Sequence, residues 1–180
     1  MTASPVTERG RKLGPLLHQL QTAMGCVASS FDSWLTLRGI RSLKVRVEQQ
    51  CKTAATVAEY LDRHPLVTKV HYPGLESHPQ HDIAKRQMKG GFGGVLSFEM
   101  EDDVWATAVA GALKTIQRAT SLGGTETLIE HRASIEPPGR VTSPPGLLRL
   151  SIGLEDPEDI LRDLERALTI ARQVVENSEV

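Results

Sequence analysis

The sequence predicts an α+β fold, a sheet of about four mostly antiparallel strands with helices packed on one face. The candidate strands alternate apolar and polar residues, as strands do when only one face is buried. Apolar residues at helical spacing over residues 40–61 and 160–175 can cover that face. Aromatic residues make up only 4% of the chain. The core is therefore mainly aliphatic, which fits helices layered on a sheet.

The composition excludes several classes of protein. A net charge of -1 gives no basic excess for a nucleic-acid partner. No apolar run approaches the roughly 20 residues of a membrane span, and residues 1–5 lack the apolar core of a signal peptide. Cys26 and Cys51 are not spaced as zinc ligands and form no disulfide framework. We therefore expect a soluble, cytoplasmic protein with reduced thiols.

The first third of the chain predicts helices. Residues 1–15 are expected to be an N-terminal tail, because glycines and Pro15 weaken the helical pattern before Leu16. A helix is expected from about Leu16 to Met24. The next is capped by a serine at 29 or 30 and hinged near Gly39, from which a long helix runs to His64.

The rest of the chain alternates strands and helices. The stretch at 131–146 contains four prolines and is expected to be an irregular surface loop. The segment at 125–130 follows a turn and is left unassigned. The predicted strands are residues 67–72, 95–100, 115–120 and 147–154, and the predicted helices are residues 81–88, 104–113 and 157–175.

Arg149 is the candidate binding residue. Leu148 and Leu150 point to the core side of the last strand, so Arg149 and Ser151 point the other way. A guanidinium fork on a rigid strand suits a carboxylate or a phosphate. The alternative is an ion pair with a nearby glutamate. For a carboxylate-binding arginine, we expect the isolated chain to leave its charge waiting for a ligand.

Histidines and a glycine-rich run offer weaker candidates. His71, His78 and His81 suggest a zinc site, although solvated loop histidines explain them equally. The run at 90–94 precedes a strand, whereas a nucleotide-binding loop opens a helix. His131 and its neighbour Arg132 could assist an anion site or simply decorate the surface.

Several stretches resemble successive motifs of one enzyme family. They are Ser30–Leu43, Gly91–Phe98, Thr120–Leu128 and Leu148–Asp156. They are similar to motifs of the Cys/Met-metabolism pyridoxal-phosphate enzymes, which include cystathionine γ-synthase, cystathionine γ-lyase, cystathionine β-lyase and methionine γ-lyase. The resemblance implies that residues 16–176 are the C-terminal domain of a fold-type I enzyme, without its cofactor-binding domain.

The resemblance implies roles for four substrate-binding positions. Arg149 matches the arginine that pairs with the substrate α-carboxylate. Ser121 matches a residue at a turn that helps to hold the substrate and the cofactor lysine, and Leu122 belongs to the same turn. Thr120 stands where γ-synthases and γ-lyases commonly carry a glutamate that can meet a distal amine, so cystathionine specificity is weakened.

The resemblance also implies a missing group. The family holds pyridoxal phosphate as a Schiff base on a lysine in a Ser-x-Thr-Lys setting. None of the lysines has that context: Lys12, Lys44, Lys52, Lys69, Lys85, Lys89 and Lys114. We therefore assign no catalytic, cofactor-binding or metal-binding residue, and we expect the chain to be inactive alone.

Three hypotheses of function follow. The first is the substrate-carboxylate-binding part of a carbon-sulfur lyase or transferase of transsulfuration, acting on a small amino acid. It would work with a cofactor domain from a missing N-terminal segment or a second chain. The alternatives are a non-catalytic binding module and an oligomerisation partner of full-length relatives or of itself.

Overall fold

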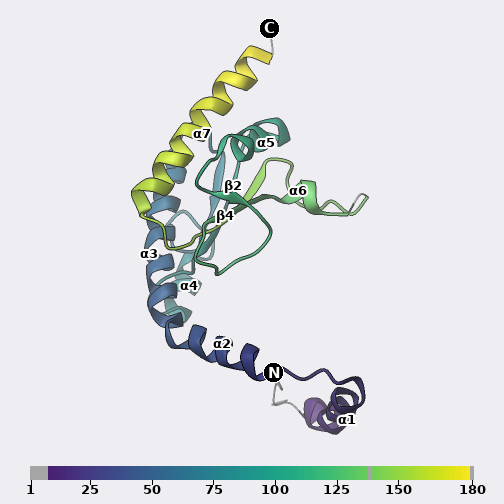
Figure 1. Cartoon of the computed structure of the whole chain (residues 1–180). Coiled ribbons are helices and arrows are strands. Elements are labelled where there is room, and N and C mark those ends of the chain that lie inside the picture. The colour runs from purple at the N-terminus through teal and green to yellow at the C-terminus, as the bar shows by residue number, and fades with distance from the viewer. Residues whose placement is uncertain (1–7, 138, 179–180) are drawn as a thin grey trace. The chain divides into compact units, whose positions relative to one another are not determined.

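A computed structural model of the chain describes residues 8–137 and 139–178, in two compact units divided between Leu43 and Lys44. The first unit contains helices α1 (Glu8–Met24) and α2 (Ser30–Arg41), and the second contains the sheet (Figure 1). Helix α1 begins eight residues before the expected Leu16, because the straight-chain residues that precede Pro15 are good helix formers. The predicted domain limits, 16–176, stay a prediction.

Helix α2 starts at the predicted cap and ends after the predicted hinge. The Ser29 hydroxyl accepts a hydrogen bond from the Asp32 backbone N–H at 3.0 Å. Gly39 lies inside α2, and the break falls at Ser42, whose N–H bonds the Gly39 carbonyl in a tight last turn. The long helix, α3 (Leu43–Asp62), follows at once.

The sheet has five strands in the order β1-β2-β5-β4-β3. All neighbours are antiparallel except β3 and β4, which are parallel. The α+β class and the mostly antiparallel sheet are confirmed. The additional strand is β4. It lacks the usual alternation of buried and exposed residues, because two consecutive residues of the strand, Ile129 and Glu130, are both buried. The strands are β1 (Lys69–His71), β2 (Val95–Glu99), β3 (Gln117–Arg118), β4 (Leu128–His131) and β5 (Leu147–Ser151).

One face of the sheet carries the core. Leu96, Phe98, Leu148 and Leu150 are at most 1% exposed and pack against buried residues of α3, α5 (Asp103–Ala112) and α7 (Pro157–Ser178). Figure 1 shows α3 and α7 along the same side of the sheet. The helices therefore cover one face, as the sequence predicts, and the other face is left for polar residues.

Two short helices complete the fold. Helix α4 (His81–Gln87) matches the expected polar helix. Helix α6 (Arg132–Ile135) lies inside the stretch predicted as irregular. It is a single turn, which is too short to leave a periodic apolar pattern in the sequence.

A buried carboxylate on α7 fixes the chain that enters β3. Asp163 accepts hydrogen bonds from the backbone N–H groups of Lys114, Thr115 and Ile116, and it also pairs with Arg166. Burial by itself raises the pKa of Asp163, but the hydrogen bond from Ile116 and the other donors outweigh it and hold this pKa below its ordinary value. The carboxylate therefore stays ionised and ties the last helix to the sheet.

Candidate substrate-carboxylate site

Arg149 lies on β5, on the sheet face opposite the core. In the strand register it is the partner of Ser97 on β2 and of Glu130 on β4. Directly paired residues of antiparallel strands point to the same face. Its side chain is 24% exposed, and the Nε atom of its guanidinium is buried.

Two neighbours aim the Arg149 guanidinium. Its Nη1 lies 2.9 Å from Oε1 of Glu130, and its Nη2 donates a hydrogen bond of 2.8 Å to the carbonyl oxygen of Ser121. The expectation that the charge awaits a ligand in the isolated chain is therefore wrong, because Arg149 forms an ion pair with a nearby glutamate. The cause is register, since it places a buried acid directly beside the arginine. The role of Arg149 in binding a carboxylate stays a prediction.

The turn that carries Ser121 is anchored to the end of β5. The Gly123 N–H donates to the Ser151 hydroxyl at 3.2 Å. Further along, Glu155 accepts hydrogen bonds from both the backbone N–H and the hydroxyl of Thr127, each at 2.6 Å. Gly153 passes so close that an added Cβ would lie 2.4 Å from the carbonyl oxygen of Thr125. These contacts fix the position of the Ser121 carbonyl beside Arg149.

The four predicted substrate-binding residues have different surroundings. Ser121 reaches Arg149 through its backbone, and Leu122 is exposed. Thr120 lines a hollow of about 330 Å³ between α5, β4 and α6, whose wall also includes Glu130 and Ile129. The structure thus brings Ser121 and Arg149 together, and Thr120 lines the same hollow as Glu130.

Glu130 was not among the site residues predicted from the sequence. Its side chain is 2% exposed, and its Oε1 also lies 2.9 Å from Nη1 of Arg132, whose Nη2 is 3.6 Å from Oε1 of Glu136. The hydroxyl of Ser143 and the Thr142 N–H donate to Glu136 and lower its pKa. No pattern in the sequence marks Glu130, because its contact with Arg149 depends on the pairing of β4 with β5.

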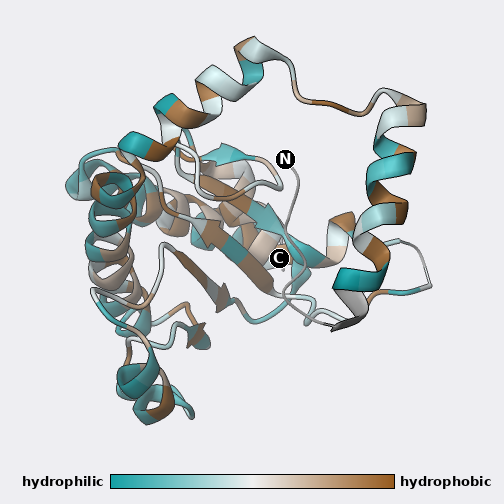
Figure 2. Ribbon diagram, turned by 90° about the horizontal axis from the view of Figure 1, so that it is seen from below, coloured by the Kyte–Doolittle hydropathy of each residue, from teal (hydrophilic) through white to brown (hydrophobic). Residues whose placement is uncertain are grey.

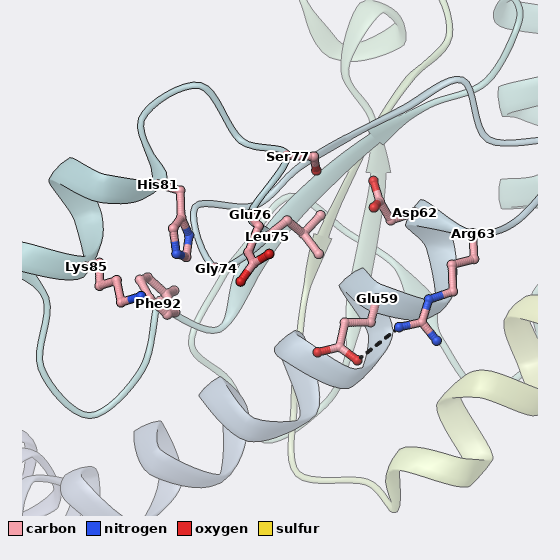
Figure 3. A pocket seen from close by; sticks show the side chains of 10 residues that line it. All are labelled: Glu59, Asp62, Arg63, Gly74, Leu75, Glu76, Ser77, His81, Lys85 and Phe92. Atoms are coloured by element: carbon pink, nitrogen blue, oxygen red, sulfur yellow. Dashed lines mark ion pairs between the residues drawn. The ribbon is translucent and has the colours of Figure 1, made fainter.

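A second hollow, of about 530 Å³, lies beside α3 (Figure 3). On one side, Glu59 of α3 forms an ion pair with Arg63, which directly follows that helix, and His81 and Lys85 of α4 lie on the other side. The His81 ring bonds the Pro73 carbonyl oxygen at 2.9 Å. Within the described residues, no group of three potential ligands could hold a metal ion. The lining residues form a polar surface groove.

Two further features bear on the sequence predictions. None of the helices in the described ranges is long and apolar enough to cross a membrane. Both cysteines are free, and Cys51 is buried in α3.

Comparison with known proteins agrees with this fold. Residues 3–169 match the family model described as Cys/Met metabolism PLP-dependent enzyme, where PLP is pyridoxal phosphate. The chain belongs to this family. The family is pyridoxal-phosphate-dependent and acts in methionine and cysteine metabolism.

Curated relatives carry different activities. The chain is 44% identical to a cystathionine β-lyase of Coxiella burnetii, over 88% of this chain and 43% of the relative. It is 43% identical to an L-methionine γ-lyase of Fusobacterium nucleatum, over 83% of this chain and 40% of that protein. A cystathionine γ-synthase of Mycobacterium bovis is 44% identical to the chain, over 83% of this chain and 39% of that protein. Similar identities to a lyase and a synthase leave the reaction unassigned.

Solved structures agree with the fold. The crystal structure of metB from Corynebacterium glutamicum matches with a TM-score of 0.80 and 40% identity, covering 88% of this chain and 42% of that one. A cystathionine γ-synthase from Xanthomonas oryzae, crystallised with aminoacrylate and cysteine, matches with a TM-score of 0.76 and 42% identity. These neighbours are fold-type I enzymes, and the chain spans about two-fifths of their length.

Proposed function

We propose that this chain is the substrate-carboxylate-binding part of a pyridoxal-phosphate-dependent carbon-sulfur lyase or transferase of transsulfuration. One observation carries the proposal. Arg149 is aimed by Glu130 and by the Ser121 carbonyl on a rigid strand, and its side chain is partly exposed. A pre-aimed guanidinium is what recognition of an amino-acid carboxylate requires.

We assign the Arg149 site to the substrate and not to the cofactor. Pyridoxal phosphate, when bound, supplies the electron sink for chemistry at the substrate's carbon atoms, and it needs a lysine amine to hold it. Lys69 and Lys85 each line a hollow, but these hollows are separate from the one that Glu130 and Thr120 line. We therefore assign no cofactor-holding residue within this chain.

Exposed apolar residues on the first unit suggest that another protein segment covers them. Helix α2 has no buried residue, and Phe31, Trp34 and Leu37 are each more than half exposed. Figure 2 shows apolar residues repeated along α1 and α2. Apolar patches of this kind mark interaction sites. We propose that a cofactor-bearing segment covers them, whether it precedes this sequence or belongs to another chain; a second copy of the chain is the alternative. A cytoplasmic location is part of the proposal.

Complementation tests the proposal. The chain should be combined with the N-terminal part of the Coxiella burnetii relative that it does not match, in the presence of pyridoxal phosphate. We expect the mixture to release a 2-oxo acid from cystathionine or cysteine, and we expect neither part to do so alone, because each lacks groups that the reaction needs.

The spectrum of the chain alone provides a second readout. With pyridoxal phosphate it should show no stoichiometric visible band beyond that of random surface lysines. A band abolished by one lysine substitution would contradict the assignment. If the mixture forms a stable complex but stays inactive with every substrate, the chain is a binding or oligomerisation module derived from the family.

Thr120 should influence the choice of substrate. In the complemented enzyme, Thr120→Glu should shift the ratio of kcat/KM toward cystathionine and away from methionine, because it adds a negative charge for a distal amine. Thr107→Glu is the matched control, since Thr107 lies on the same hollow but on α5. Equal ratios for wild type and Thr120→Glu would mean that this position does not read the substrate.

A further inference from the structure

We infer that Glu130 and Arg132 are positioning residues that act through Arg149. Glu130 aims the guanidinium, and Arg132 offsets the charge of Glu130 so that Arg149 keeps its attraction for a carboxylate. The inference rests on the proposed function, since it assumes that Arg149 receives the carboxylate of the substrate.

Burial makes Glu130 a firm anchor. Its side chain is 2% exposed, and one oxygen, Oε1, lies 2.9 Å from Nη1 of Arg149 and equally far from Nη1 of Arg132. A buried carboxylate is tolerated only where ion pairs and hydrogen bonds compensate its lost hydration. Rotation of the Arg149 guanidinium would break its bonds to both Glu130 and the Ser121 carbonyl, so the fork is fixed in one orientation.

The charges around Arg149 explain the role of Arg132. If Glu130 faced Arg149 alone, it would neutralise the guanidinium and repel an incoming carboxylate. Because two arginines share Glu130, part of its charge is answered by Arg132. Glu136 holds Arg132 from the other side, and hydrogen bonds from Ser143 and Thr142 lower the pKa of Glu136 and keep it ionised.

Arg118 is the other charged residue on the wall of the hollow that includes Glu130. In the strand register, however, Arg118 is the partner of Ile129, which faces the core, so Arg118 is not counted with Arg149. The cluster then has two cations, Arg132 and Arg149, and two acids, Glu130 and Glu136. Oε2 of Glu130 and Nε of Arg149 are buried and have no hydrogen-bond partner among the described residues.

The two roles predict opposite effects for two changes at Glu130. Glu130→Gln keeps an acceptor oxygen but removes the charge, so Arg149 should stay aimed and should bind a carboxylate at least as tightly. Glu130→Ala removes the acceptor, so Arg149 should lose its orientation. Arg132→Met removes the offsetting charge and should weaken carboxylate binding about tenfold, although Arg132 itself contacts no ligand.

The test uses NMR on the whole chain labelled with nitrogen-15. Distinct Nη1 and Nη2 resonances of Arg149 report a guanidinium that does not rotate freely. We expect distinct resonances in the wild type and in Glu130→Gln, and merged resonances in Glu130→Ala. The binding probe is L-2-aminobutyrate, with its carboxamide as the matched control. Arg132→Met should weaken binding of the acid and leave binding of the carboxamide unchanged.

Two outcomes would overturn the inference. One is distinct Arg149 resonances in Glu130→Ala, and the other is unaltered L-2-aminobutyrate affinity in Arg132→Met. If Glu130→Ala fails to fold, the first outcome is replaced by another: merged Arg149 resonances in Glu130→Gln would then overturn the inference. Failure of the proposed function looks different, because the wild-type chain would then bind acid and carboxamide alike while the guanidinium resonances still report the orientation of Arg149.

Discussion

Replacement of Asp163 by Ala should lower the free energy of unfolding by about 4 kcal/mol. The change removes the acceptor of three backbone N–H groups, at Lys114, Thr115 and Ile116, and the partner of Arg166. The Asp163 side chain is only 4% exposed, so water cannot easily replace it. Urea unfolding followed by circular dichroism measures the loss. Asp159→Ala is the control, since the Asp159 side chain is 51% exposed and its pair with Arg162 should contribute little.

The contribution of Asp163 should disappear in acid. The pKa of Asp163 is lower in the folded chain than its ordinary value of 3.8. A lowered folded-state pKa stabilises the fold above the unfolded pKa, and this stabilisation is lost as the pH falls through the folded-state value. Asp163→Asn cannot titrate, so the stability difference between wild type and Asp163→Asn should shrink below about pH 4. A loss under 1 kcal/mol for Asp163→Ala at neutral pH would contradict this account.

The sequence predicts those parts of the fold that follow from short-range periodicity. The alternation of Leu148, Arg149 and Leu150 predicted both the strand β5 and the face on which Arg149 lies. The last helix begins where its sequence suggests, because the Asp156 carboxylate precedes it and accepts a hydrogen bond from the Glu158 N–H at 2.9 Å. These features depend only on neighbouring residues, which the sequence displays directly.

The sequence could not predict which strands are neighbours. Glu130 contacts Arg149 because β4 pairs with β5, although the two residues are far apart in the sequence. Periodicity reports which face a residue occupies and carries no information about the partner strand. The resemblance to the family pointed to Arg149 and Ser121 but said nothing about Glu130, so the acid became visible only in the sheet register.

Replacement of Arg149 by Leu should abolish recognition of the substrate carboxylate. In the complemented enzyme, kcat/KM for amino-acid substrates should fall by the equivalent of about 2 to 5 kcal/mol, because a charge-assisted, bidentate contact is lost. Stability should fall as well, by about 2 kcal/mol, since buried Glu130 is left with Arg132 as its ion-pair partner.

A double variant separates these two effects. Glu130→Gln combined with Arg149→Leu removes the buried charge that Arg132 alone compensates only in part, so it should recover most of the lost stability. It should not recover activity, because the guanidinium is still absent. Thermal melts and steady-state kinetics on the same preparations provide both readouts. Recovery of activity in the double variant would show that Arg149 matters only as the structural partner of Glu130.

Paired kinetics with a substrate and its carboxamide test most directly whether Arg149 binds the carboxylate of the substrate. In the complemented enzyme, the wild type should prefer the acid by a large factor, and Arg149→Leu should lose most of this preference while it turns over the carboxamide about as well as the wild type. An unchanged ratio of acid to carboxamide kcat/KM in Arg149→Leu would contradict this role of Arg149.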